Sequence, residues 1–572
     1  MNKNSYKYKL NTFYKKTRKQ KPKSKSKSNK SNQHSTNKMF KEILGNVWIT
    51  DPNNIQFPEM KQSLYRKYNP EGVSLAFSGG GRRAYSGYIG VLRGLYNIDI
   101  YNSNAFIKSQ FVSVVSGSAW LLGTFLFANK NINKDLLLGK SIHPKDITLS
   151  TLHNTNFENN DFLGNRLIDV NIQQYLEQAY KKGIRPEYIW SYSIGQIFLK
   201  YYGLNDKIMA LNDSHAKNIY MLTKKKPIIP SNNSPFLISN CSIINTTKKK
   251  KSGTTIFQVT PYYSGTLNTL CYKKKTNSTS CIGGVLQDTY ILGSINPLLQ
   301  ENLLNNKDSI QIKAKIPLYQ TNLFTLDSMI GVSGDSQIEK FTYISQNIIQ
   351  SYNLWSPLTT NTSLCQIGDG AYCDVIGITS LLTRNVKHII AFVSCSSDIP
   401  EGTTIHDYNG FSEIPILNLF GLYNNNYTNI DPNFNQSNDM QVFSKSDWPY
   451  FAKNILYTKS KGGPVYSRTK LQVLPNTLLG IKGGYDVDLL VIVIQKSRIF
   501  NNLLPKSISD TFSNESGPFP NFPNYPMVNN NLNKIMSITK EETNLLSSYC
   551  EWCIINTPLK HIIQQMYIES GV

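Results

Sequence analysis

Three stretches of this 572-residue chain share one pattern: a short apolar or β-branched run, a turn of small residues, and then apolar positions at helical spacing. The first begins at Val73, reaches Phe77, passes three consecutive glycines and continues with apolar side chains at i, i+3, i+4 and i+7 over residues 88–95. The second is "FVSVV" at 111–115, followed by "GSAWLLGTFLFA", whose all-round apolarity predicts a buried helix. The third is "SLCQIGDGAYC" at 363–373, followed by a helical pattern and the strand-like "HIIAFVSC".

Strands that alternate with helices predict an α/β fold, with three layers around a largely parallel central sheet and a serine on a strand-helix elbow. In such folds functional residues gather at the carboxyl ends of the strands. The continuous apolar run "VDLLVIVI" at 487–494 predicts a further, fully buried strand. We interpret roughly residues 145–345 as sheet extension and an inserted cap over the site, because this region contains lysine runs at 224–226, 248–251 and 273–275.

Positive charge is concentrated at the N-terminus. The formal charge of the chain is +24, but residues 1–38 hold 13 Lys and Arg and no Asp or Glu, which leaves a surplus of 11 for the rest. This Lys/Ser/Asn-rich segment has too little apolar surface to offset the entropy of ordering, so we expect a disordered basic tail over residues 1–40. Such a tail can hold an anionic membrane or a phosphate backbone, act as a localisation signal, or simply solubilise the chain.

The remaining bulk features exclude several classes of protein. The N-terminus lacks the apolar core of a signal peptide, and no stretch approaches the roughly 20 apolar residues of a spanning helix, so we expect a soluble, cytoplasmic protein. Eight cysteines do not make a disulfide framework in a chain of this length. Cys550 and Cys553 form one C-x-x-C without a second pair at zinc-site spacing, so we expect no metal and no cofactor.

Ser116 is the first candidate for chemistry. It lies where a strand-like run stops and a buried helix begins, between Val115 and Gly117. A sharp strand-to-helix turn exposes a hydroxyl at the sheet edge and directs a helix N-terminus, which favours developing negative charge, at whatever binds there. Ser-Gly-Ser is equally typical of a turn with a helix N-cap.

The triple glycine supplies what an acyl transfer needs beside a nucleophile. Such a reaction builds an oxyanion that requires preorganised donors, and Gly80 and Gly81 can present backbone N–H groups with no Cβ in the way. A phosphate-binding Walker loop requires Gly-Lys-Ser/Thr at its end, and here Arg82-Arg83-Ala84 follows. Arg83, entering the helix, can hold a substrate phosphate as a planar fork.

The proton of Ser116 needs an acceptor. Asp369 lies between two glycines at the end of a strand-like run, and an aspartate is an effective base in a site shielded from water. Asp374, one helical turn further on, is the alternative. None of the seven histidines has a comparable position, so a Ser-Asp dyad accounts for more of the pattern than a Ser-His-Asp triad, which stays open.

Taken together, these motifs resemble those of the patatin-like and cytosolic phospholipase A2 superfamily. "FSGGGRRAYSGYIGVLRGL" is similar to the S-G-G-G-x-R-A/G segment of the family, "VVSGSAW" to its nucleophile segment G-x-S-G-S-x-W, and "DGAYCD" to its D-G-A/G. The three occur in the order of the family, and "FQVTPYYSG" at 257–265 is similar to a fourth segment, so the resemblance covers roughly residues 70–400. It implies Ser116 as nucleophile, Asp369 as general base, Gly80 and Gly81 as oxyanion donors, and Arg83 as the cation that faces a phosphate.

The resemblance makes residues 41–572 a phospholipase-like catalytic domain. It implies a lipid acyl hydrolase of the phospholipase A2 or lysophospholipase type, with a phospholipid or lysophospholipid as substrate and peripheral contact with anionic membranes through the basic tail. One departure is Val114, since the family usually has Gly two residues before the serine, and a β-branched residue there crowds the turn. A catalytically inactive relative that binds lipid or protein therefore stays an alternative, and a nucleic-acid-associated protein is a third.

Overall fold

The structure is a computed structural model, and its description covers most of the chain beyond the N-terminal tail. The described residues are 40–50, 57–61, 68–244, 255–273, 279–295, 309–317, 323–335, 350–412, 414–422, 440–513, 517–529, 531 and 534–571. The predicted disordered tail, residues 1–40, lies outside the described residues except for Phe40.

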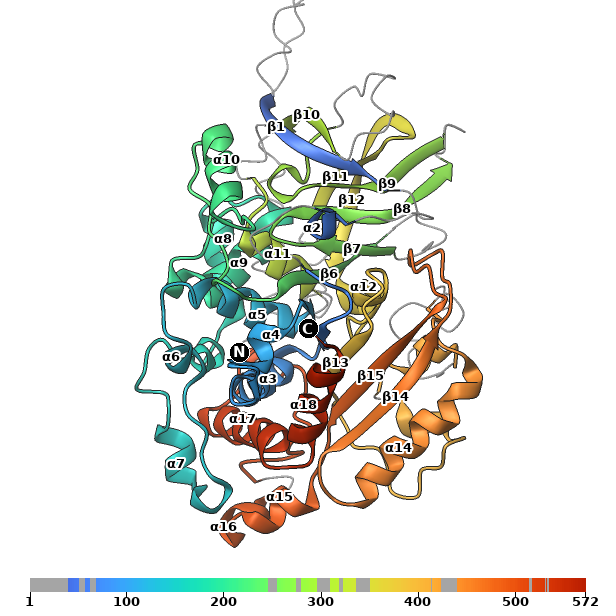
Figure 1. Cartoon of the computed structure of the whole chain (residues 1–572). Helices are drawn as coiled ribbons and strands as arrows, with labels where there is room; N and C mark the ends of the chain where they lie inside the picture. The colour runs from blue at the N-terminus through green and yellow to red at the C-terminus, as the bar shows by residue number, and fades with distance from the viewer. Residues whose placement is uncertain are drawn as a thin grey trace, which may run out of the picture.

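One large sheet runs through the molecule (Figure 1), in the order β10-β1-β9-β8-β7-β6-β5-β2-β13-β15-β14. Its centre is parallel and consists of β6 (Phe236–Ile244), β5 (Phe111–Val115), β2 (Val73–Phe77), β13 (His388–Ser394) and β15 (Tyr485–Ile494). The predicted α/β class and the buried strand over 487–494 are confirmed.

Both sides of this parallel centre continue as antiparallel strands. On one side β14 (Val465–Val473) pairs with β15. On the other side β6 pairs with both β7 and β12. The strands beyond β6 are β7 (Thr255–Val259), β8 (Tyr263–Lys273), β9 (Thr279–Asp288), β1 (Phe40–Ile49) and β10 (Ile310–Pro317), together with the hairpin of β11 (Ser351–Ser356) and β12 (Thr359–Asp369).

Helices cover both faces of the central strands, which gives the predicted three layers. In β13, Ile390 and Phe392 join a core cluster with α3 (Gly81–Tyr96) and α5 (Gly117–Ala128), whereas Ile389 and Ala391 join a second cluster with α14 (Trp448–Ser460). Successive residues of a strand point to opposite faces, so the two clusters lie on opposite sides of the sheet. On the side of α3 lie also α17 (Lys540–Ile555) and α18 (Leu559–Glu569), and on the side of α14 lies α12 (Thr379–Leu382).

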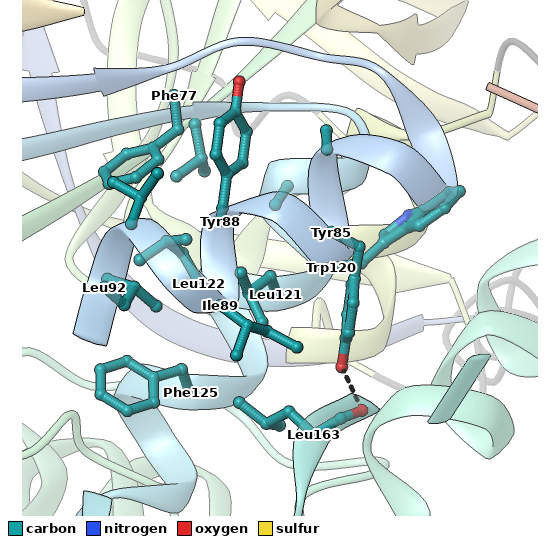
Figure 2. Packing of buried hydrophobic residues seen from close by; sticks show 14 of the residues in the cluster. Phe77, Tyr85, Tyr88, Ile89, Leu92, Trp120, Leu121, Leu122, Phe125 and Leu163 are labelled. Atoms are coloured by element: carbon teal, nitrogen blue, oxygen red, sulfur yellow. Dashed lines mark hydrogen bonds between the residues drawn. The ribbon is translucent and has the colours of Figure 1, made fainter. Parts of the chain in front are cut away.

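The contact between α3 and α5 is part of the larger cluster (Figure 2). Ile89 and Leu92 of α3 lie beside Leu121 and Phe125 of α5. Every residue of α5 is buried, as its all-round apolar sequence predicts. The hydroxyl of Tyr85 donates to the carbonyl oxygen of Leu163 at 3.1 Å, so this aromatic ring buries its polar end with a partner.

The predicted cap segment, roughly residues 145–345, contributes helices and also strands β6 to β10 of the sheet. Its boundaries stay a prediction. Its main helices are α8 (Ile172–Lys181), α9 (Pro186–Phe198), α10 (Asp213–Thr223) and α11 (Leu326–Ser333). The remaining short α-helices and strands of the described residues are α2 (Pro58–Lys61), β3 (Asp99–Ile100), β4 (Ser103–Asn104), α4 (Ala105–Lys108), α6 (Lys134–Leu138), α7 (Leu149–Asn154), α15 (Arg498–Leu503) and α16 (Lys506–Ser509).

A disulfide that the sequence analysis did not anticipate joins two strands of this segment. Cys271 of β8 and Cys281 of β9 stand directly opposite each other in the antiparallel ladder and are bonded. Cys550 and Cys553 are buried free thiols of α17, and burial raises the pKa of Cys553 to about 12. Within the described part of the chain, no helix combines the length and apolarity that crossing a bilayer requires.

Candidate active site

Ser116 lies on a strained turn between β5 and α5. Its φ of 56° and ψ of −123° are unusual for a residue other than glycine, and neighbouring structure must hold such a conformation in place. The backbone N–H of Ser116 donates to the hydroxyl of Ser333 at 3.1 Å. The side chain is nearly buried, in the position that a strand-helix elbow gives to a nucleophile.

The glycine segment lies directly against this elbow. A Cβ on Gly117 would come within 2.3 Å of the carbonyl oxygen of Gly81, and a Cβ on Gly79 within 3.2 Å of the Cβ of Ser116. The tight approach of helix and strand therefore falls at Gly117. Val114, where crowding was expected, is a regular buried residue of β5 that pairs with Phe77.

The amides of the glycine segment differ in their partners. The N–H of Gly79 donates to the carbonyl oxygen of Val375 at 2.9 Å. Within the described part of the chain, the N–H groups of Gly80 and Gly81 donate no hydrogen bond. Both glycines have positive φ, 142° and 54°, which turns the backbone sharply as α3 begins. The two predicted oxyanion donors are thus open backbone donors in the segment that contacts Ser116.

Asp369 meets Ser116 from the end of β12, 253 residues further along the chain. The hydroxyl of Ser116 donates to Oδ2 of Asp369 at 2.9 Å. Oδ1 of Asp369 accepts the N–H of Ala371 at 2.9 Å, and the whole side chain is buried. The structure therefore brings the two predicted dyad residues into hydrogen-bond contact.

Two residues that the sequence analysis missed hold the backbone of this pair. At the end of α11, Ser333 accepts the N–H of Ser116 and donates to the carbonyl oxygen of Asn240 at 2.8 Å. Two positions further on, Oδ1 of Asp335 accepts the N–H of Asp369 at 2.7 Å. One helix end thus fixes the backbone at both members of the dyad. No local pattern in "MIGVSGD" signals this, because the contacts span 217 and 34 residues.

The alternative bases have other partners. The carboxylate of Asp374 accepts the N–H groups of Ile376, Gly377 and Thr379 and the hydroxyl of Thr379, at 2.6 to 3.0 Å, and so organises its own loop. Nδ1 of His388 lies 3.6 Å from Oδ2 of Asp488. Burial lowers the pKa of His215 to about 4. The geometry favours Asp369 over these groups as the partner of Ser116.

Arg83 is buried and bonded to the protein itself. Its guanidinium donates to the hydroxyl and carbonyl oxygens of Ser394, at 2.8 and 3.1 Å, and to the carbonyl oxygen of Tyr525 at 2.7 Å. These bonds fasten the start of α3 to β13 and to a C-terminal segment. The predicted contact of Arg83 with a substrate phosphate would require an exchange of these bonds.

A small depression adjoins the loop that follows Asp369. Val375, one of its lining residues, also contacts the glycine segment, because its carbonyl oxygen accepts the N–H of Gly79. The lining residues are Ala371, Cys373, Asp374, Val375, Pro415, Asn418, Leu419 and Met440. Among the described residues, no three His, Cys, Asp or Glu side chains gather into a set that could hold a metal ion.

This arrangement has a clear chemical capacity. A hydroxyl bonded to a buried carboxylate can lose its proton as it attacks a carbonyl carbon. Open backbone N–H groups and the N-terminus of α5 beside it can stabilise the negative oxygen that forms.

Comparison with protein-family models and with curated proteins gives no match. Among solved structures, the chain is similar to human GIVD cytosolic phospholipase A2, with 11% identity and a TM-score of 0.45 over 89% of this chain and 64% of that chain. Structures of that protein with methyl gamma-linolenyl fluorophosphonate, with and without terbium chloride, match at 12% and 13% identity, each with a TM-score of 0.38, over 89% of this chain and 61% of theirs. The chain thus spans less than two thirds of the length of these structures.

Proposed function

We propose that this chain is a serine carboxylic-ester hydrolase that cleaves fatty-acyl esters of glycerophospholipids or lysophospholipids. The observation that carries the proposal is the 2.9 Å hydrogen bond from Ser116 to the buried carboxylate of Asp369, on a strained elbow beside the open amides of Gly80 and Gly81. The ordered motifs of the sequence support the lipid substrate.

In the first step, Oγ of Ser116 attacks the ester carbonyl carbon while Asp369 accepts its proton. The oxyanion binds the N–H groups of Gly80 and Gly81, each of which typically contributes roughly 3 to 4 kcal/mol at the transition state. The carbonyl reforms as the bond to the alcohol oxygen breaks, and that oxygen takes the proton from Asp369. The products are an acyl-enzyme and the free alcohol. This alcohol is a lysophospholipid when the substrate is a phospholipid, and a glycerophospho compound when the substrate is a lysophospholipid.

In the second step, Asp369 accepts a proton from water, whose oxygen attacks the acyl carbonyl. The same two amides hold the second oxyanion. The fatty acid leaves as the bond to Oγ breaks, and Asp369 returns its proton to Ser116. Ser333 and Asp335 serve as positioning residues, because their bonds fix the backbone from which each reacting side chain projects. Arg83 is the candidate cation for a phosphate oxygen.

The test compares fatty-acid release from phosphatidylcholine and lysophosphatidylcholine by the wild type, Ser116→Ala and Asp369→Asn. We expect each substitution to lower kcat by about 10³-fold or more, because the two groups act as a unit. A fluorophosphonate should label the wild type at Ser116, located by mass spectrometry, and should leave Ser116→Ala unlabelled.

Thermal unfolding of each variant is the control for intact folding. Wild-type protein that neither releases fatty acid nor takes up the label would instead support a non-catalytic lipid- or protein-binding relative. Activity that survives in Asp369→Asn alone would move the role of base to Asp374 or to a histidine.

A further inference from the structure

Helix α10 exposes three of its large apolar side chains to solvent. Tyr220, Met221 and Leu222 are 51%, 53% and 37% exposed, whereas the flanking Ile219 and Thr223 are buried. A surface helix of a globular protein ordinarily turns its apolar stripe toward the core. Three successive exposed apolar residues are therefore a feature that the fold of the chain does not require.

Positive charge surrounds this apolar triplet. Lys224, Lys225 and Lys226 follow it and are exposed, and the exposed Lys217 lies one helical turn before Met221. Lys224 has a left-handed conformation, and its N–H donates to the carbonyl oxygen of Tyr220 at 2.8 Å, so the chain turns and the lysines stay beside the triplet. Residues 214–229 contain no Asp or Glu.

The patch is built on a fixed part of the fold. The segments on either side of α10 pair with each other through Ala210 N to Ile228 O and Ile228 N to Ile208 O, both at 2.8 Å. The N–H of Leu326, the first residue of α11, donates to the carbonyl oxygen of Lys207 at 2.9 Å. This connects the base of α10 to the helix whose other end binds Ser116.

We propose that this α10 surface, formed by Tyr220, Met221 and Leu222 with Lys217 and residues 224–226, docks the protein on an anionic lipid bilayer. The apolar triplet enters the boundary of the acyl chains, while the lysine ammonium groups stay at the level of the lipid phosphates. The inference rests on the proposed function in one respect, since a lipid hydrolase meets its substrate at such a surface. A nucleic acid would pair with the lysines but leave the three apolar side chains in water.

The experiment is co-sedimentation of the full chain with vesicles of phosphatidylcholine alone and of phosphatidylcholine mixed with an equal amount of phosphatidylserine. The variant Met221→Ser with Leu222→Ser should weaken binding to the mixed vesicles about tenfold or more, since it removes most of the inserted apolar area. The variant Lys224→Ser with Lys226→Ser should also weaken binding to the mixed vesicles about tenfold or more, and the loss should shrink as salt is added. Tryptophan emission of Met221→Trp should shift to the blue when these vesicles are added.

Helix α14 supplies the matched control. Tyr450 and Tyr457 are 61% and 60% exposed and flank the exposed Lys453, and α14 lies at the lower right of Figure 1, far from α10 at the upper left. The variant Tyr450→Ser with Tyr457→Ser should bind vesicles like the wild type. The proposal fails if the α10 variants bind like the wild type, as they would if the basic tail alone held the membrane. It fails equally if the α14 control loses as much vesicle binding. Single-stranded RNA in place of the vesicles gives one more outcome: the proposal fails if the lysine variant loses binding to the RNA and keeps its binding to vesicles.

Hydrolysis of a water-soluble short-chain ester by the wild type separates this inference from the proposed function. Vesicle binding through α10 without any such hydrolysis would count against the hydrolase and leave the docking surface in place. Hydrolysis without vesicle binding would count against the docking surface and leave the hydrolase in place.

Discussion

At the scale of single residues, Gly117 sets how closely α5 approaches the glycine segment. Gly117→Ala would place a methyl group 2.3 Å from the carbonyl oxygen of Gly81, so the elbow or the glycine segment must shift. A misplacement of about 1 Å can cost roughly 100-fold in rate, so we expect kcat for ester hydrolysis to fall by about that factor. Overpacking should also lower the free energy of unfolding by about 1 to 3 kcal/mol, which denaturant unfolding measures.

Gly463→Ala is the control for that substitution. A Cβ at Gly463 would meet only Cδ1 of Ile499, at 3.7 Å, which is ordinary contact, so both the rate and the stability should stay close to wild type. A Gly117→Ala enzyme with an unchanged rate would show that the amides of the glycine segment do not need this distance from Ser116.

The site residues that the sequence predicted carry a local sequence pattern, whereas those that it missed are defined by contacts between distant segments. Ser116 and Asp369 could be proposed because each follows a strand-like run and stands beside glycine, which is a local pattern. Their 2.9 Å contact, and the bonds from Ser333 and Asp335, depend on how segments 34 to 253 residues apart fold together. Crowding was expected at Val114 because this residue was placed in the turn, whereas it belongs to β5 and the turn falls at Ser116.

At the scale of elements, α11 carries a buried acid in its first turn. Burial, and to a lesser degree the charge of Asp206, raises the pKa of Asp327 to about 7. The folded state therefore holds a proton that the unfolded state releases near pH 4, and the stability that this proton contributes is present at low pH and lost as pH rises through about 7. The melting temperature should fall between about pH 4 and pH 7, and Asp327→Asn should reduce that fall by about 1 to 3 °C.

Thermal unfolding across this pH range measures the effect. The fall of melting temperature with pH should be less steep in the variant than in the wild type. It should not vanish, because burial also raises the pKa of Asp288 in β9 to about 7. Equal slopes in wild type and variant would mean that Asp327 ionises in the folded protein without cost.

Elements with one strong apolar pattern were predictable, and paired elements were less so. The helix α5 and the strand β15 are apolar almost throughout, which local sequence reports directly. The antiparallel strands β7 to β10 lie among lysine-rich stretches, and their pairing depends on turns and partners rather than on composition. The disulfide between β8 and β9 was missed for the same reason, since it follows from register.

At the scale of the whole molecule, a buried ion pair joins a segment near the N-terminus to the connection between α12 and β13. Glu59 accepts from Nε of Arg384 at 2.9 Å, and both side chains are fully buried. The guanidinium also donates to Gln258 at 2.9 Å and to the hydroxyl of Tyr263 at 2.6 Å, and it lies over the ring of Phe57. Three stretches that are distant in sequence, around residues 57–59, 258–263 and 384, therefore meet at one cation. No local sequence pattern predicts this contact.

Breaking this pair from one side should destabilise the protein more than removing it. Glu59→Gln leaves a buried guanidinium without its carboxylate, so denaturant unfolding should show a loss of about 3 to 5 kcal/mol. Glu59→Leu combined with Arg384→Met removes both charges and should recover a large part of that loss, because no charge is then left without a partner in the core. Asp486→Asn, which breaks the exposed pair of Lys470 and Asp486 (74% and 55% exposed), is the control and should change stability by no more than about 0.5 kcal/mol. A double variant as unstable as Glu59→Gln would show that the polar contacts of Arg384 to Gln258 and Tyr263, rather than its pairing with Glu59, hold the three stretches together.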